Sequence, residues 1–197
     1  MKSLTAGDVD EVKRRTAAGA PWSEVVPGVL GGTLLDSGFW RFFGPPELRL
    51  FSLAEWNAPN VWKHAWRGLA ALSFWGEDVF GNQILLDGEG KVFLWNHENA
   101  SAIETGFDLL TVLETCLGHG LGWIDFYSDG SYSLAKDGQL ELPIESHWHW
   151  IQPRIMGGQA TAKNLTAVER VKHLIGHGQL WLQVRGMPSG SHVIPKT

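Results

Sequence analysis

The sequence predicts an α+β fold, in which a central, mainly antiparallel sheet is flanked by helices and followed by a C-terminal helical extension. The first observation is the stretch 73–98, where short apolar runs are separated by turn residues, as is typical of strands. The second is the apolar spacing of three and four residues elsewhere, which is typical of amphipathic helices. The third is composition: 44% hydrophobic residues suffice for a core, and 19% charged residues disfavour disorder.

The clearest local prediction is a β-hairpin. Residues 83–87 and 91–95 are short apolar runs that flank the turn Gly88-Glu89-Gly90. In each run, alternate positions on both faces carry apolar side chains. We therefore expect the two runs to pair as adjacent strands, in a sheet that packs on a core with one face and is covered on the other.

Capping motifs predict the first helices. Thr5 and Asp8 form a capping box, and the helix that follows ends before Gly19 and Pro21. A second box begins at Ser52, in Ser52-Leu53-Ala54-Glu55, and opens a helix that Pro59 breaks. A restart is expected after Asn60, with Trp62 and Trp66 four residues apart on one face.

Two more helices are expected later in the chain. After a polar stretch to Thr105, apolar residues recur at helical spacing, and Gly118 ends that helix. These residues are Phe107, Leu110, Leu113 and Leu117. A capping box at 166–169 predicts a last helix with an apolar stripe of Val168, Val171, Ile175 and Leu182. For 119–145, paired strands and an irregular helix are both open.

The length of 197 residues predicts a single domain, 1–197, with a core at about 27–118 and the extension at about 119–197. A single cysteine, Cys116, excludes a disulfide framework and favours a reducing compartment. The sequence contains no apolar signal core and no run approaching 18 apolar residues, so a cytoplasmic protein without membrane contact is expected.

The net charge of −5 argues against nucleic-acid binding, which normally requires a basic surplus, and it suits a basic protein partner. Eleven tryptophans are many for a chain of this size, and most are expected in the core. We predict that Trp75 and Trp95 are mostly buried and that at least one belongs to the core.

The central stretch also resembles a known family. It runs from an apolar strand through a Gly-rich acidic turn and Gly81-Asn82 to a strand ending at Leu86-Asp87, and then through the hairpin to 92–98, VFLWNHE. From about Phe43 to Leu117, this order resembles the SUKH superfamily of small α+β domains, many of which are bacterial immunity proteins that bind and neutralise toxins. The chain departs from many relatives at Asn96, where they carry Asp.

The segment after residue 118 is similar to the C-terminal extension of some immunity proteins tied to contact-dependent or type VI secretion. The resemblance implies a non-catalytic immunity protein, which would neutralise a cognate toxin by stoichiometric binding. Acidic residues near the sheet turns are the expected partner-binding positions: Glu77, Asp78, Glu89 and Glu98. No catalytic residue, metal or cofactor is expected. A scaffold or regulatory role is the alternative.

A zinc-dependent hydrolase is a further alternative, because His147 and His149 would share one face of a strand and could bind zinc. Three residues could supply the missing third ligand: His119, Asp125 or Glu145. The segment His147-Trp148-His149-Trp150 equally describes a strand with a buried indole face, and the sequence has no HExxH or GxSxG motif. We therefore expect no metal at His147 and His149.

Overall fold

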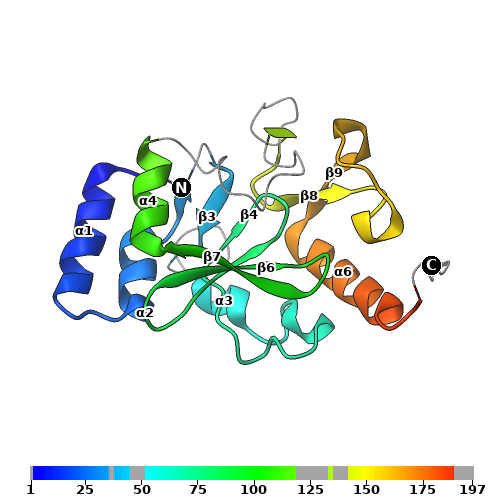
Figure 1. Ribbon diagram of the computed structural model, residues 1–197, viewed down its shortest axis with the longest axis horizontal. Coiled ribbons are helices and arrows are strands. Elements are labelled where there is room, and N and C mark those ends of the chain that lie inside the picture. Colours follow the sequence, from blue (N-terminus) through cyan, green and yellow to red (C-terminus); the bar gives the residue numbers. More distant parts are fainter. Residues whose placement is uncertain (1, 36–37, 45–51, 119–132, 135–141, 189–197) are drawn as a thin grey trace.

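The computed structural model describes residues 2–35, 38–44, 52–118, 133–134 and 142–188 (Figure 1). In this part of the chain, seven strands form one sheet in sequential order. They are β1 (Lys2–Ser3), β2 (Thr33–Leu35), β3 (Trp40–Phe42), β4 (Gly76–Asp78), β5 (Gln83–Leu86), β6 (Lys91–Asn96) and β7 (Ser101–Asp108). All neighbouring strands are antiparallel except β1 and β2. The predicted α+β class with a mainly antiparallel sheet is confirmed.

The helices and a small second sheet surround this sheet. The helical elements are α1 (Ala6–Ala17), α2 (Trp22–Val25), the π-helical turn Val26–Leu30, α3 (Leu53–Asn57), the 3-10 turn Lys63–Ala65, α4 (Leu109–Gly118), the 3-10 turns Arg154–Met156 and Ala162–Asn164, and α6 (Arg170–Val184). Strands β8 (Ser146–Trp150) and β9 (Leu165–Glu169) pair antiparallel and lie beside α6 (Figure 1). No helix within the described ranges has the length and apolarity that a bilayer span requires.

The predicted hairpin is present. Gln83 pairs with Trp95 and Ile84 pairs with Leu94, which makes β5 and β6 adjacent antiparallel strands. The alternation separates their side chains onto two faces. One face of the hairpin contributes Ile84 to a core shared with α1, α2 and α4, while the other contributes Trp95 to a core that includes residues of α3 and α6.

Both sheet faces are therefore covered, as expected. Trp95 is fully buried in an aromatic cluster, with ring centroids 4.8 Å from Trp66 and 5.8 Å from Trp62. Trp75 is mostly buried and packs against the core on the other face. The prediction for Trp75 and Trp95 is confirmed, and most of the stability of the sheet must come from this two-sided burial of large apolar surfaces.

Both N-terminal capping boxes form as the sequence predicts. The Thr5 hydroxyl accepts a hydrogen bond from the Asp8 amide at 3.2 Å, and the Asp8 carboxylate accepts one from the Thr5 amide at 3.0 Å. Ser52 and Glu55 make the same reciprocal pair at the start of α3. These local contacts satisfy amides that the first helical turn leaves without partners, and short-range sequence is enough to specify them.

Three predicted elements differ from the structure, two of them because strand pairing overrides the local pattern. Residues 101–108 form the edge strand β7, so the helix that was expected to include Phe107 begins at Leu109. Residues 165–169 pair with β8, and α6 begins at Arg170 with Glu169 as its N-cap. After Asn60 only the 3-10 turn at 63–65 forms. The prediction for 119–145 falls largely outside the described residues.

Candidate functional site

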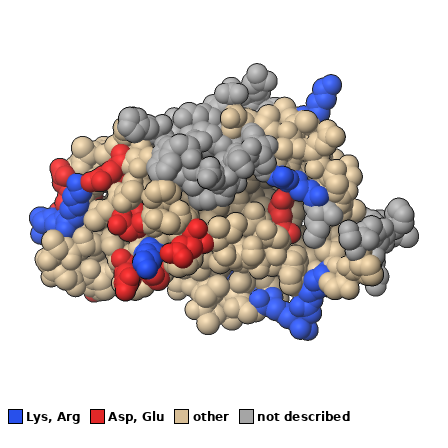
Figure 2. All heavy atoms as spheres, in the orientation of Figure 1, with Lys and Arg blue, Asp and Glu red and all other residues tan. Residues whose placement is uncertain are grey.

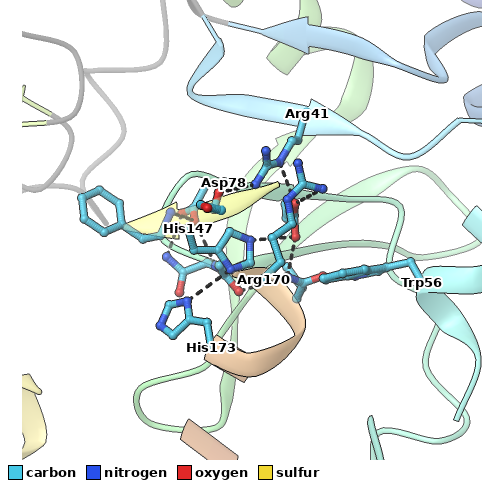
Figure 3. A network of polar contacts seen from close by, with 12 residues as sticks. Arg41, Trp56, Asp78, His147, Arg170 and His173 are labelled. Atoms are coloured by element: carbon cyan, nitrogen blue, oxygen red, sulfur yellow. Dashed lines mark hydrogen bonds and ion pairs between the residues drawn. The ribbon is translucent and has the colours of Figure 1, made fainter. Parts of the chain in front are cut away.

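A buried ionic network joins the seven-stranded sheet to the C-terminal part of the chain (Figure 3). Glu77 on β4 lies at its centre and has no solvent exposure. Its Oε1 lies 2.6 Å from Nε of Arg41 and 3.0 Å from Nη1 of Arg170, and its Oε2 lies 2.9 Å from Nε2 of His147. The four side chains come from β3, β4, β8 and the start of α6, so the network connects the large sheet, the small sheet and the last helix.

The two arginines also hold the chain that leads into β8. Arg41 donates from Nη1 to the carbonyl of Ile144 at 2.7 Å and from Nη2 to the carbonyl of Ser146 at 3.2 Å. Arg170 donates to the same Ile144 carbonyl. In Figure 3 the guanidinium groups of Arg41 and Arg170 lie side by side, with His147 beside them. The paired carboxylate offsets two cations that would be costly to bury alone.

The charges of the network follow from this geometry. Burial alone would raise the pKa of Glu77, but the charges of Arg170 and Arg41 and the contact with His147 hold it well below its usual range. Burial lowers the pKa of Arg41 to about 10, so its guanidinium stays protonated at neutral pH. Burial also lowers the pKa of His147, although Glu77 opposes the shift. The network is thus one carboxylate, two guanidinium cations and a neutral imidazole.

Asp78, the next residue of β4, organises the turn that follows. Its Oδ1 accepts hydrogen bonds from the amides of Phe80 and Asn82, each at 2.9 Å, and its Oδ2 accepts one from Nδ2 of Asn82 at 2.7 Å. The Oδ1 of Asn82 is then left to face Nδ1 of His97 at 3.1 Å. Asp78 therefore positions Asn82, and Asn82 orients an imidazole.

The acidic positions expected to bind a partner do not form one surface. Glu77 and Asp78 are fully buried, so their assignment to a surface contact is wrong: Glu77 pairs with Arg41 and Arg170, and Asp78 accepts hydrogen bonds from the turn that follows β4. Glu98 is mostly covered, and burial raises its pKa. Only Glu89 is fully accessible, with 81% of its side chain exposed.

Five histidines form a cluster that shares His147 with this network. The sequence pattern around β8 predicts only part of this cluster. The five histidines are His97 just after β6, His147 and His149 on β8, and His173 and His177 on α6. Neighbouring rings lie edge to face, with centroids between 4.6 and 5.2 Å apart. All are buried except the half-buried His149.

Strand β8 is present where it was expected, but the two histidines on it have different partners. His147 contacts Glu77 and, through Nδ1, lies 3.2 Å from Nδ1 of His173. His149 lies with Nδ1 3.3 Å from Nε2 of His177. Of the third ligands considered, Glu145 is exposed, while positions 119 and 125 lie outside the described residues.

The residues best placed to hold a metal ion are ones that the sequence analysis did not single out. Among the described residues, His97, His173 and His177 each offer a ring nitrogen, and these atoms lie within 4.8 Å of one another. The four-residue spacing of His173 and His177 on one helix face was a usable signal. His97, by contrast, is brought to them only by the packing of α6 against the sheet.

Burial sets the protonation of these rings. The pKa values of His97 and His173 lie well below the usual range, first because of desolvation and then because other imidazoles of the cluster surround them. The same causes lower the pKa of His177 to about 3. The rings are therefore neutral at pH 7, which is the form in which imidazole binds a metal.

A pocket of about 410 Å³ opens beside the cluster. Its wall includes His149 and His177, and its other side chains come from the segment after β8 and from α6. They include Ile151, Gln152, Met156, Leu180 and Gln183. The cluster is thus buried on most sides but borders a space large enough for water and small solutes.

Comparison with known proteins places no family name on the chain. No protein-family model and no curated protein matches its sequence. A solved structure, Atu4351 from Agrobacterium tumefaciens, is similar over 89% of this chain and 81% of that one, with 14% sequence identity and a TM-score of 0.49.

Proposed function

We propose that this protein acts by stoichiometric binding to another protein, a basic bacterial toxin encoded beside it, and neutralises that toxin as an immunity protein in the cytoplasm. The observation that carries the proposal is an exposed acidic strip along the β7 edge of the sheet, formed by Glu89, Glu104 and Asp108. The resemblance of 43–117 to the SUKH superfamily supports the same function.

The strip lies where a partner can reach it. Glu104 and Asp108 are exposed on β7, and Glu89 is exposed in the hairpin turn before β6. Lys91 pairs with Asp108 across the β6–β7 ladder, so the turn and the edge strand adjoin. Ile103, 41% exposed, is the neighbour of Glu104 on β7 and points to the opposite face of the sheet. The acidic side chains of the strip suit a partner that presents basic residues.

Strand β7 also offers backbone hydrogen bonds. It is the last strand in the sheet order and has no second strand partner among the described residues. An edge strand of this kind presents amide and carbonyl groups to which an extended segment of another protein can pair. Because such pairing is insensitive to sequence, the acidic side chains would supply its specificity for a basic partner.

Charge is distributed unevenly along the chain, and the part that contains the β7 strip is the acidic one. The described residues of 2–118 contain thirteen Asp and Glu against eight Lys and Arg, whereas those of 142–188 contain two against five. In Figure 2, acidic side chains gather over the half that carries α1, α2 and β7. A basic partner approaching this half would be steered by the field, mainly through a faster association rate.

The chemistry of the buried network favours binding over catalysis by Glu77. A general base needs a pKa near the working pH, whereas Glu77 is held ionised between Arg41 and Arg170 with a strongly lowered pKa. Its geometry suits a rigid support for the sheet. Rigid surfaces bind with less loss of conformational entropy, which is what a stoichiometric inhibitor requires.

The experiment is co-expression of this protein with the product of the neighbouring gene. Growth should be restored at about one copy per toxin, and the purified complex should bury roughly 1,200–2,000 Å². If the neighbouring product is harmless, or if sub-stoichiometric amounts of this protein restore growth by turnover, the proposal is wrong.

The binding face is tested by two variants with the same change in net charge. The first, Glu89→Gln with Glu104→Gln and Asp108→Asn, removes three negative charges and keeps the acceptor with which position 108 caps the Thr111 amide at 2.8 Å. The matched control, Gln159→Lys with Thr166→Lys and Leu182→Lys, adds three positive charges at exposed positions of the C-terminal part. Association should slow and lose salt dependence more in the first variant. Equal effects would exclude the β7 strip as the contact.

A further inference from the structure

We infer that His97, His173 and His177 form a binding site for one divalent transition-metal ion of the zinc class, which links α6 to the central sheet. This site differs from the pair His147 and His149 considered from sequence, for which no metal was expected. It does not depend on the proposed toxin-binding function, and each can fail without the other.

Two buried ring nitrogens of the cluster have no hydrogen-bond partner within the part of the chain that the structure describes. Nε2 of His97 and Nε2 of His173 are both buried and have no partner among the described residues. Each residue is about 3% exposed, so bulk solvent does not reach these nitrogens. Burying an unpaired polar atom is costly, and proteins rarely keep two together without a ligand that uses them.

Hydrogen bonds fix the tautomers of His97 and His173 so that both of these nitrogens carry lone pairs. Nδ2 of Asn82 donates to Asp78, so Oδ1 of Asn82 is an acceptor and Nδ1 of His97 must donate to it. In the neutral imidazole of His97, Nε2 then carries a lone pair. This is the arrangement that second-sphere partners impose on metal-binding histidines.

A chain of contacts from Glu77 through His147 fixes the tautomer of His173. The ionised Glu77 can only accept, so Nε2 of His147 donates to it and Nδ1 of His147 is left as an acceptor. Nδ1 of His173 then donates to Nδ1 of His147, across 3.2 Å, and Nε2 of His173 carries a lone pair. A carboxylate thus orients the ligand histidine through an intervening imidazole, and the two arginines hold the carboxylate in place.

The spacing of the three ring nitrogens suits a single metal ion. Three neutral imidazoles offer nitrogens within 4.8 Å of one another. Nitrogens bound to one tetrahedral zinc at about 2.0–2.1 Å lie roughly 3.4 Å apart. Side-chain movements of about 1 Å would therefore bring the three nitrogens to coordination distance. His173 and His177 are one helical turn apart on α6, and His97 faces them from the end of β6, which gives three ligands from two elements.

A metal ion can reach the three histidines from the pocket. His177 lines the pocket beside the cluster, so an ion can enter from that side and a water molecule can complete its coordination. His149, with Nδ1 3.3 Å from Nε2 of His177, borders the same pocket. A site with three imidazole ligands and a position open to solvent matches the ligand preference of Zn²⁺, and it suits Co²⁺ and Ni²⁺ as well.

The test uses the full chain without a histidine tag, stripped with a chelator and dialysed against Zn²⁺. We expect about one Zn²⁺ per chain by elemental analysis and a rise in Tm with Zn²⁺ concentration. Replacement by Co²⁺ should give the strong visible absorption of a tetrahedral site with nitrogen ligands. A chain that takes up no stoichiometric Zn²⁺ and gives no such absorption would overturn the assignment.

Variants locate the site. His97→Gln, His173→Gln and His177→Gln should each weaken Zn²⁺ binding by more than the roughly 10–100-fold that loss of an outer-sphere partner costs. His64→Gln is the matched control, because His64 is exposed and lies outside the cluster. Binding that survives in all three variants, or that falls equally in the control, would refute the site. If a variant does not fold, the stoichiometry and the Co²⁺ spectrum of the unaltered chain decide the question.

Discussion

Nε2 of His147 donates a hydrogen bond to Oε2 of Glu77 across 2.9 Å, and neither side chain is exposed to solvent. The two residues are 70 positions apart, on β8 and β4. With the amide of Trp148, which donates to the carbonyl of Val79 at 2.7 Å, this contact fixes the C-terminal part to the sheet. The histidine cluster therefore depends on an ionic network that is itself structural.

Glu77→Gln should destabilise the protein by about 3–5 kcal/mol. The change leaves the buried charges of Arg41 and Arg170 without their shared counter-charge, which costs much more than loss of a surface ion pair. Urea denaturation measures the free energy of unfolding. Glu104→Gln, at an exposed position of β7, is the control and should stay within about 0.5 kcal/mol of the original. Similar small effects in both variants would contradict the structural role of Glu77.

Gly81→Ala should be more destabilising than Gly19→Ala. Both glycines have positive φ, +93° and +82°, so both alanines carry the cost of a left-handed backbone, about 1 kcal/mol. At Gly81 the added Cβ would also lie 2.8 Å from Nδ1 of His147, whereas at Gly19 it would meet nothing within 4 Å. The difference between the two free energies of unfolding isolates the contact with the histidine cluster. Equal losses of stability would show that the histidine cluster accommodates the added methyl group without a free-energy cost.

Stability of the metal-free protein should fall as the pH drops from about 6.5 towards 3. The unfolded chain protonates His177 near its usual pKa of 6.5, but the folded protein does so only near 3, because burial and the neighbouring His149 and His147 oppose the charge. The stability contribution is therefore complete above pH 6.5 and is lost as the pH falls, by about 1.4 kcal/mol per pH unit for this one group. His97 and His173 shift in the same direction and steepen the loss.

Denaturation at pH 7.0, 6.0 and 5.0 in the presence of chelator measures this slope. Glu98, whose pKa is raised by burial, acts in the opposite direction, because it binds its proton more readily in the folded state. His177→Gln should reduce the slope, and His64→Gln, at an exposed position, should leave it unchanged. A free energy of unfolding that is constant from pH 7.0 to 5.0 would mean that the buried imidazoles are not held neutral.

Trp95→Ala should cost about 3–5 kcal/mol, the range for a large cavity left by an aromatic side chain. Trp95 contacts Trp62, Trp66 and Phe74, so the surrounding rings cannot all collapse into the space. Thermal or chemical denaturation provides the measurement. Leu117→Ala, at a position 43% exposed on α4, is the control and should change stability much less. An unchanged Tm for Trp95→Ala would contradict the burial of this indole.

The sequence alone determined the features that depend on neighbours along the chain. The alternation of residues 83–95 and the DGEG turn specified the hairpin, because period-two apolar patterns fix which side chains point to each face. The capping boxes at Thr5 and Ser52 specified helix starts, because both partners lie within one turn. The burial of Trp95 followed from its hydrophobic surface and its place in that alternation.

Only the tertiary structure decided which polar groups meet. Glu77 and Asp78 look like turn acids in sequence, and only the approach of Arg41, Arg170 and Asn82 shows that their carboxylates are buried and satisfied. Likewise, β7 and β9 form strands because a partner strand is available to each, although local pattern assigned Phe107 and residues 166–169 to helices.

The candidate metal site shows the same division. The spacing of His173 and His177 is visible in the sequence, because both lie on one helix. His97 comes from a strand end 76 residues earlier, and its nitrogen reaches the other two only when α6 packs on the sheet. The physical reason is that coordination depends on distances of a few ångströms between side chains. A linear pattern fixes such distances within a helix or a hairpin, and only packing fixes them between elements.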